Sequence, residues 1–195
     1  MLKTTVRSAA LLILTSAGNA ALGSETGTIQ ADPDTAFLQF VDATRFLANY
    51  KEMAAVSARV FGARAQGSDS QYAAFMAKVA VADLSDMRGC MGRAYASGSM
   101  TSSDAVNLVQ IFTSPVGKKV IDISKTMVID SLEKGTPAPA DWSSITPAER
   151  AEVVSIYQNP AFQRYGAHVS TPAFQLAIKT CLKSSKVARE NGLEL

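Results

Sequence analysis

Apolar side chains recur at steps of three and four residues along most of the chain, the spacing that places them on one face of an α-helix. The pattern predicts a long helix from residue 32 to about residue 65, and another from residue 69 or 70 to about residue 96. Gly89 and Gly92 weaken the second helix, so a bend or a close approach to another helix is expected near Cys90. A last helix is expected from residue 170 or 171 to near residue 192.

Two sharp corners are predicted between the remaining helices. Thr101 and Asp104 have the spacing of a capping box, and Ser114 followed by Pro115 marks a second helix start. The same sequence of signals recurs forty-five residues later, with a capping box at 146–149 and a corner at 159–160. The sequence therefore predicts an internal helix-corner-helix repeat, whose corner residues are Phe112, Ser114, Pro115, Gly117, Asn159 and Pro160.

The predicted fold class is all-α, because no stretch shows the strict apolar and polar alternation of a β-strand. We expect an irregular antiparallel bundle of about six or seven helices, in a single domain at residues 32–195. Residues 136–143 are predicted to be a linker, since Pro137 and Pro139 cannot continue a helix. Trp142, the one tryptophan, is expected to pack on the bundle and pin the linker, with ligand stacking as the alternative.

Residues 1–23 are predicted to be a signal peptide. Lys3 and Arg7 precede an apolar run at 9–14, and small residues follow it, so cleavage is expected after Ala20 or Gly23. A membrane anchor is the alternative, but the run falls short of the roughly twenty apolar residues that span a bilayer. Residues 24–31 are expected to be a flexible lead-in. The mature protein is expected in the periplasm or secreted, with no transmembrane span.

The charge balance gives no indication of a nucleic-acid partner. The chain has nineteen Lys and Arg and seventeen Asp and Glu, and loss of Lys3 and Arg7 with the signal peptide leaves it close to neutral. The basic residues are scattered among acidic ones, whereas phosphate binding needs a dense basic face.

Cys90 and Cys181 are the two cysteines, and each lies on the apolar face of its predicted helix. In an exported chain each is the other's natural partner, so a disulfide is the favoured interpretation. Two buried free thiols and a reactive pair are the alternatives.

Recognisable catalytic and metal-binding patterns are missing from the sequence. His168 is the one histidine, which excludes multi-histidine zinc sites, and it is expected to cap a helix or lie on the surface. Phosphate loops, Cys-x-x-Cys pairs and nucleophile elbows do not occur, so we predict no enzyme, metal or cofactor. Met76, Met87 and Met91 are candidates for an adaptable apolar groove, with a place in the core as the commoner alternative.

Residues 111–119, Ile-Phe-Thr-Ser-Pro-Val-Gly-Lys-Lys, resemble the corner of the family called domain of unknown function 2059, which occurs in exported bacterial proteins. Its hallmark is a helix ending in a Phe-Tyr-x-Ser-Pro-x-Gly-x-Lys-like corner, and Thr113 stands where that family often has tyrosine. The resemblance covers about residues 100–132, with residues 146–164 as a weaker echo. It implies an all-helical, bacterial, periplasmic protein and supplies no catalytic residue.

These observations favour a non-enzymatic exported protein that binds an unknown envelope protein or a second copy of itself, or that serves as a structural factor of the envelope. The alternative is a carrier of a small apolar molecule such as a lipid. An enzyme of an unfamiliar type would need a pocket with convergent polar groups. A cavity lined by apolar side chains would favour the carrier.

Overall fold

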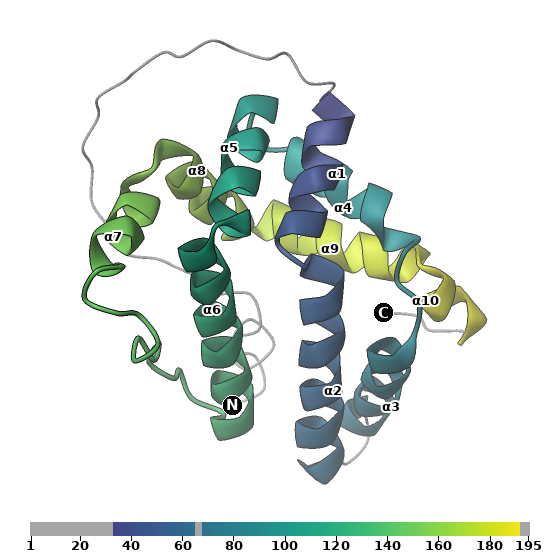
Figure 1. The fold of residues 1–195 in the computed structure, drawn as a ribbon. Helices are drawn as coiled ribbons and strands as arrows, with labels where there is room; N and C mark the ends of the chain where they lie inside the picture. Colours follow the sequence, from purple (N-terminus) through teal and green to yellow (C-terminus); the bar gives the residue numbers. More distant parts are fainter. Residues whose placement is uncertain (1–32, 65–67, 192–195) are drawn as a thin grey trace.

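This computed structural model describes residues 33–64 and 68–191, and these residues contain ten α-helices (Figure 1). These residues contain no strand, so the predicted all-α class is confirmed. The signal peptide predicted at 1–23, the lead-in at 24–31 and the predicted first cap at Asp32 lie outside the described residues. The helices are α1 (Pro33–Ala43), α2 (Phe46–Arg64), α3 (Ser68–Val81), α4 (Met87–Ala96), α5 (Ser102–Thr113), α6 (Pro115–Lys134), α7 (Arg150–Gln158), α8 (Pro160–Val169), α9 (Pro172–Ser184) and α10 (Lys186–Glu190).

The predicted count of six or seven helices is too low, because three predicted helices are each divided in two. The first break separates α1 from α2 at Thr44 and Arg45. The Thr44 hydroxyl donates to the carbonyls of Phe40 and Val41, at 3.1 and 3.0 Å. Arg45 has a φ of 52°, a left-handed conformation that a right-handed helix cannot continue through. The apolar spacing runs on across this corner, so the prediction of one continuous helix is wrong.

The second break lies at residues 82–86, between α3 and α4, and not at the two glycines. The Asp83 carboxylate accepts hydrogen bonds from the amide and the hydroxyl of Ser85, a local turn that competes with helix. Gly92 lies instead where α4 crosses α1, because a Cβ atom there would come within 3.1 Å of Leu38 Cδ2. The close approach predicted near Cys90 is therefore confirmed, while the continuous helix is wrong.

Ser185 divides the last predicted helix into α9 and α10. Its buried hydroxyl donates to the carbonyl of Leu182 at 2.5 Å and accepts from the amide of Ala188 at 3.4 Å. One serine thus ends one helix and caps the next. The described helix ends at Glu190, before the predicted end near residue 192.

The corner between α5 and α6 has the predicted capping. Thr101 accepts a hydrogen bond from the amide of Asp104, and the Asp104 carboxylate accepts one from the amide of Thr101, which completes the capping box. Ser114 then caps α6, because its hydroxyl accepts from the amide of Gly117 at 3.0 Å. Pro115 is the first residue of α6, as predicted.

The second repeat unit, α7 with α8, departs from the prediction at its start. The Glu149 carboxylate accepts from the amide and the hydroxyl of Thr146, both at 2.9 Å, but α7 begins only at Arg150 and has no side-chain cap. The predicted helix start at residue 146 is therefore wrong. Asn159 caps α8 through the first backbone amides of that helix, and Pro160 is its first residue, as predicted.

The two repeat units contact each other reciprocally. Asp104 of the first unit accepts hydrogen bonds from Arg164 of the second. Forty-five residues after Asp104, Glu149 accepts from Lys119, which lies forty-five residues before Arg164. Equivalent positions of the repeat therefore meet in space. A second pair of contacts, with longer hydrogen bonds of 3.3 and 3.5 Å, follows the same reciprocity: Ser114 with Glu152, and Asn159 with Asn107.

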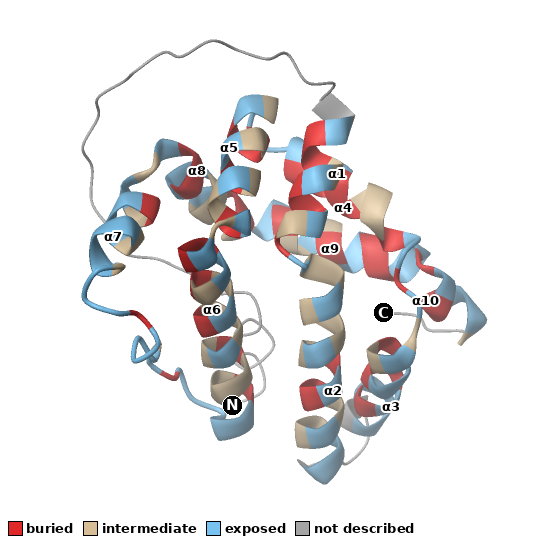
Figure 2. Ribbon diagram, in the orientation of Figure 1, coloured by how far each residue is buried: buried red, intermediate tan, exposed pale blue. Residues whose placement is uncertain are grey.

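Most buried side chains form one core where α1, α4, α5, α8 and α9 come together (Figure 2). Phe40 lies at its centre and contacts the rings of Tyr95, Phe112 and Tyr165, with ring centroids 4.9, 6.0 and 5.5 Å away. Outside this core, α2 packs against both α3 and α6. A small separate cluster joins α2 to α6: Val56, Val128 and Leu132.

Candidate functional site

A cleft of about 120 Å³ lies between α2 and α6, and residues of α4, α5, α8 and α9 complete its lining. The Arg45 corner directs α2 away from α1, and the Ser114 corner directs α6 away from α5. Figure 1 shows the two helices running down the molecule, with α9 crossing behind the end of α1. The two corners therefore set the directions of the helices that form the walls of the cleft.

The lining of the cleft is mainly apolar. Seven of its seventeen residues are aromatic, and they come from five helices. Phe46 stacks on Tyr50 with ring centroids 5.8 Å apart, and Tyr95 lies against Phe174 at 4.9 Å. Such a surface favours an apolar occupant, because each Å² of apolar area removed from water contributes roughly 25 cal/mol. The aromatic residues are Phe46, Tyr50, Tyr95, Phe112, Phe162, Tyr165 and Phe174.

Lys125 of α6 provides the one amine of the lining. Its side chain is 19% exposed, and its Nζ lies 2.8 Å from Glu52 Oε2 and 3.7 Å from Asp122 Oδ1. Two carboxylates therefore face one amine at this part of the cleft. An anion would have to compete with both carboxylates for Lys125, so the amine is not a free anion site.

Asn49 of α2 contributes a buried polar atom that lacks a partner. Its Nδ2 donates to the carbonyl of Thr44 at 3.0 Å, which fixes the orientation of the amide. Its Oδ1 is shielded from solvent, and no donor among the described residues reaches it. An unsatisfied buried acceptor costs about 1–3 kcal/mol, which makes Asn49 the chemically distinctive residue of the lining.

Two tyrosine hydroxyls meet at the floor of the cleft. Tyr95 and Tyr165 are hydrogen-bonded to one another through their side chains. Burial raises the pKa of Tyr165 to about 12 and raises that of Tyr95 well above its usual value. Burial likewise raises the pKa of the Tyr50 hydroxyl. These phenols stay neutral across the physiological pH range, so they add no charge to the lining.

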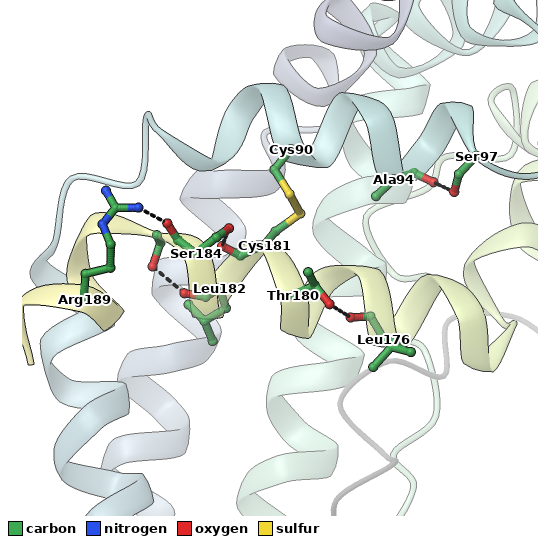
Figure 3. The surroundings of a disulfide bond; sticks show 10 residues. Cys90, Ala94, Ser97, Leu176, Thr180, Cys181, Leu182, Ser184 and Arg189 are labelled. Atoms are coloured by element: carbon green, nitrogen blue, oxygen red, sulfur yellow. Dashed lines mark hydrogen bonds between the residues drawn. A yellow bond between two sulfur atoms is a disulfide. The ribbon is translucent and has the colours of Figure 1, made fainter. Parts of the chain in front are cut away.

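The disulfide predicted between Cys90 and Cys181 is present, with the two sulfur atoms 2.06 Å apart (Figure 3). It joins α4 to α9, two helices that are far apart in the sequence and lie side by side (Figure 3). Both helices also line the cleft, α4 through Tyr95 and α9 through Phe174 and Ile178. The bridge therefore fixes two parts of the cleft floor to each other.

The three methionines considered for an apolar groove lie in the core. Met76, Met87 and Met91 are 6, 1 and 0% exposed, and all three belong to the main core cluster. None of them lines the cleft, whose one methionine is Met53. The structure therefore supports the alternative interpretation, that these side chains belong to the core.

His168 is buried, so of its two expected roles the surface location is wrong, while a capping contact to the end of α4 is present. Its side chain packs against the core ring of Phe174, and its Nε2 donates to the carbonyl of Ala94 in the last turn of α4. Trp142, at 40% exposed, lies edge-on to Tyr157 of α7 with ring centroids 6.1 Å apart. The linker is thus held against α7 by an aromatic contact, as predicted.

The corner residues divide between the cleft and the helix caps. Phe112 is the one member of the corner motif that lines the cleft, at 4% exposed. The others cap or begin helices, as described above: Ser114, Pro115, Gly117, Asn159 and Pro160.

The described part of the chain offers no group of three His, Cys, Asp or Glu side chains that could hold a metal ion. Among its helices, none has the length and apolar character needed to cross a membrane. What the arrangement can do chemically is hold a small apolar group against an aromatic surface.

Sequence reasoning missed Asn49, Tyr50 and Lys125 as lining residues. It placed Asn49 and Tyr50 in the long helix from residue 32 and Lys125 in the helix after Pro115, each without a signal of a binding site. A local signal existed for part of this set. Phe46, Asn49, Tyr50 and Met53 follow helical spacing, so an amide sits within an otherwise apolar stripe. The aromatic residues of the other helices gave no such signal, since only tertiary packing brings them together.

Comparison of the chain with protein-family models, with curated proteins and with solved structures gives no match. The resemblance to the domain of unknown function 2059 family therefore rests on the corner residues at 111–119.

Proposed function

We propose that the protein is an exported, non-enzymatic carrier that binds a small apolar molecule, or the apolar end of a larger one, in the cleft between α2 and α6. The observation that carries this proposal is the aromatic lining, to which five helices contribute. The cleft volume of about 120 Å³ is close to that of an engineered apolar cavity of about 150 Å³ that binds benzene. The fitting group is therefore a single ring or a short acyl segment.

Export is supported by the Cys90–Cys181 bridge, because disulfides persist mainly in oxidising compartments. The resemblance at the corner and the signal-peptide pattern of residues 1–23 support a bacterial periplasmic location. N-terminal sequencing of the protein purified from the periplasm tests this part. A start at Ala21 or Ser24 is expected, and a protein retained in the cytoplasm with Met1 intact would contradict it.

Protein binding, the function that the sequence favours, has weaker support. Among the described residues, the large apolar side chains that stand exposed lie on three helices and in the linker: Tyr72, Val81, Trp142, Val154 and Leu176. Single exposed apolar residues are ordinary on a globular protein and do not indicate an interface by themselves. The aromatic cleft, to which five helices contribute, therefore favours the carrier over protein binding.

Toluene is a suitable probe for the cleft, because it is a single ring of the fitting size. A ligand that binds only the folded state raises the melting temperature. Toluene should therefore raise the melting temperature of the wild-type protein in a dose-dependent manner. In Ser124→Trp the new ring points into the cleft lining and the rise should be lost, because Ser124 of α6 is a lining residue.

Thr126→Trp is the matched control, since Thr126 lies on the same helix but is exposed. It should respond to toluene as the wild-type protein does. No rise in the wild-type protein, or an equal rise in both tryptophan variants, would overturn the proposal. Native mass spectrometry of the protein taken from the periplasm would then identify a molecule that co-purifies with the wild-type protein and not with Ser124→Trp.

A further inference from the structure

A second pocket, of about 430 Å³, lies between the corner that joins α1 to α2 and the corner that joins α5 to α6. Figure 1 shows these two corners at the same level of the molecule, above the parts of α2 and α6 that line the cleft. This corner pocket has a charged lining, in contrast to the cleft. Its charged residues are Asp42, Arg45, Lys118 and Asp122.

The corner pocket and the apolar cleft adjoin one another. Phe112 and Ile121 line both of them. Along the chain, Thr44 lines the cleft, and the next residue, Arg45, lines the corner pocket. A molecule whose apolar end fills the cleft can therefore extend its other end into charged surroundings.

The two carboxylates of the corner pocket interact with cations that lie outside it. Arg88 donates to both oxygens of Asp42, at 2.8 and 2.6 Å. Asp122 Oδ1 lies 3.7 Å from the Nζ of Lys125, which also pairs with Glu52. Neither Arg88 nor Lys125 lines the corner pocket. The negative charge of the pocket is therefore balanced at Asp42 and partly balanced at Asp122.

The two cations of the corner pocket have no such partner. Arg45 and Lys118 are both exposed, and no ion pair among the described residues includes either of them. Arg45 directly precedes α2, and Lys118 is the fourth residue of α6. Neither helix has an acidic residue in its first turn, so the partial positive charge of each helix N-terminus adds to that of the two side chains.

We propose that the ligand is a monoanionic amphiphile, a carboxylate with a short acyl chain or a single ring, whose head group binds between Arg45 and Lys118. This rests on the proposed function, since the apolar end of the same molecule occupies the cleft. The corner pocket and its ion-pair partners hold four cations and three carboxylates, so one further negative charge balances them. A guanidinium can donate two parallel hydrogen bonds to a carboxylate, and an ammonium adds a point charge.

Octanoate and octanol form the decisive pair, because they share an apolar chain and differ in the charge of the head group. Titration calorimetry at pH 7 gives the ratio of the octanoate affinity to the octanol affinity. In the paired variant Arg45→Gln with Lys118→Gln this ratio should fall at least about fivefold, since two charge-assisted contacts at a partly exposed site are lost. The octanol affinity should stay within about twofold of the wild-type value, which makes it the internal reference for any change in stability.

The paired variant Lys78→Gln with Lys179→Gln is the matched control. It removes two positive charges from exposed positions outside both pockets, so the net charge changes by the same amount. Its affinity ratio should remain within about twofold of the wild-type value. A measurement on the wild-type protein alone covers the case in which the Arg45 and Lys118 variant does not fold: the Nε–H resonance of Arg45 should shift on addition of octanoate and not on addition of octanol.

The outcomes separate the head-group site from the proposed function. If octanol binds but the ratio is unchanged in the Arg45 and Lys118 variant, or falls equally in the control, the head-group site is wrong and the carrier proposal stands. The same holds if the Arg45 resonance does not respond to octanoate.

Ser124→Trp tests whether one molecule occupies both pockets. If octanoate binds this variant as tightly as it binds the wild-type protein while the toluene response is lost, the anion binds without the cleft and the amphiphile is ruled out. If toluene, octanol and octanoate all fail to bind the wild-type protein, the proposed function fails together with the head-group site.

Discussion

Asp104, at the start of α5, is almost completely buried and is bound by the guanidinium of Arg164 from α8. Burial alone would raise the pKa of the Asp104 carboxyl, but hydrogen bonds from Arg164 and Thr101 outweigh it, and the pKa lies below its usual range. The same carboxylate thus completes a helix cap and ties together the two repeat units. This contact and its counterpart between Glu149 and Lys119 make the repeat a structural element and not merely a sequence pattern.

Removal of the Arg164 guanidinium should therefore destabilise the fold. In Arg164→Met the carboxylate of Asp104 stays buried without its cation, and we expect a loss of about 1–3 kcal/mol in the free energy of unfolding, measured in urea. Gln163→Met, at the exposed neighbouring position, is the control. Equal unfolding midpoints for the two variants would show that the ion pair has no net effect.

Gly117 tests the geometry of the corner. A Cβ atom at this position would lie 1.8 Å from the carbonyl oxygen of Ile111, which belongs to the backbone at the end of α5. Gly117→Ala should lower the free energy of unfolding by at least about 2 kcal/mol, because the corner must move to relieve the overlap. The melting temperature and the urea midpoint measure it.

Gly166→Ala is a matched control on α8, since a Cβ atom at Gly166 meets nothing within 4 Å. That substitution should be neutral or stabilising by about 0.5–1 kcal/mol, as expected for alanine in place of glycine within a helix. A Gly117→Ala protein as stable as Gly166→Ala would contradict the close approach at the corner.

Acid should weaken the contact between Lys119 and Glu149. Hydrogen bonds from Lys119 and then from Thr146 lower the pKa of the Glu149 carboxyl to about 2, below its unfolded value of about 4.5. A lowered folded-state pKa stabilises the fold above about pH 4.5, and this stabilisation is lost as the pH falls toward 2. The urea midpoint of the wild-type protein should thus fall in this window more steeply than that of Glu149→Gln.

The same titration can be followed directly by NMR of the Glu149 carboxyl carbon. In Lys119→Met the pKa of this carboxyl should rise toward its usual value, because the largest cause of its lowering, the hydrogen bond from Lys119, is removed. An unchanged pKa would mean that the ion pair does not form in solution.

Reduction of the disulfide should affect both the stability and the cleft. The bridge closes a loop of 91 residues, and its removal in the paired variant Cys90→Ala with Cys181→Ala should cost about 4–5 kcal/mol in the loop-entropy model. Because the bridge joins two helices of the cleft floor, affinity for toluene should also fall in any fraction that stays folded. Intact mass measured with and without reductant confirms the bridge, and a non-reduced sample with two free thiols would rule it out.

The sequence predicts the corners well, because capping is local. Each corner consists of a capping side chain followed by a proline: Ser114 with Pro115, and Asn159 with Pro160. The capping side chain accepts a hydrogen bond from the helix, and the proline has no amide that would need a partner, so few other residues are needed to define the corner. The disulfide was likewise predictable, since a chain with two cysteines offers each a single partner within the chain.

The breaks at Arg45 and at residues 82–86 were not predictable from periodicity, because the apolar spacing continues through both. The cleft was missed for a related reason. Its aromatic residues lie on five helices, and each belongs to an ordinary apolar face in its own segment. Only packing decides that Tyr50 and Phe162 share a lining while Met87 and Met91 fill the core.

The reciprocal contacts between the repeat units have the form of an isologous interface, in which residue i of one partner contacts residue j of the other and j contacts i. Asp104 with Arg164, and Glu149 with Lys119, satisfy this condition after the shift of forty-five residues. The chain thus holds within one polypeptide the arrangement that a symmetric homodimer of a single helix-corner-helix segment would make. The two halves nevertheless have different surroundings, since Phe112 lines the cleft whereas its counterpart Tyr157 packs against Trp142.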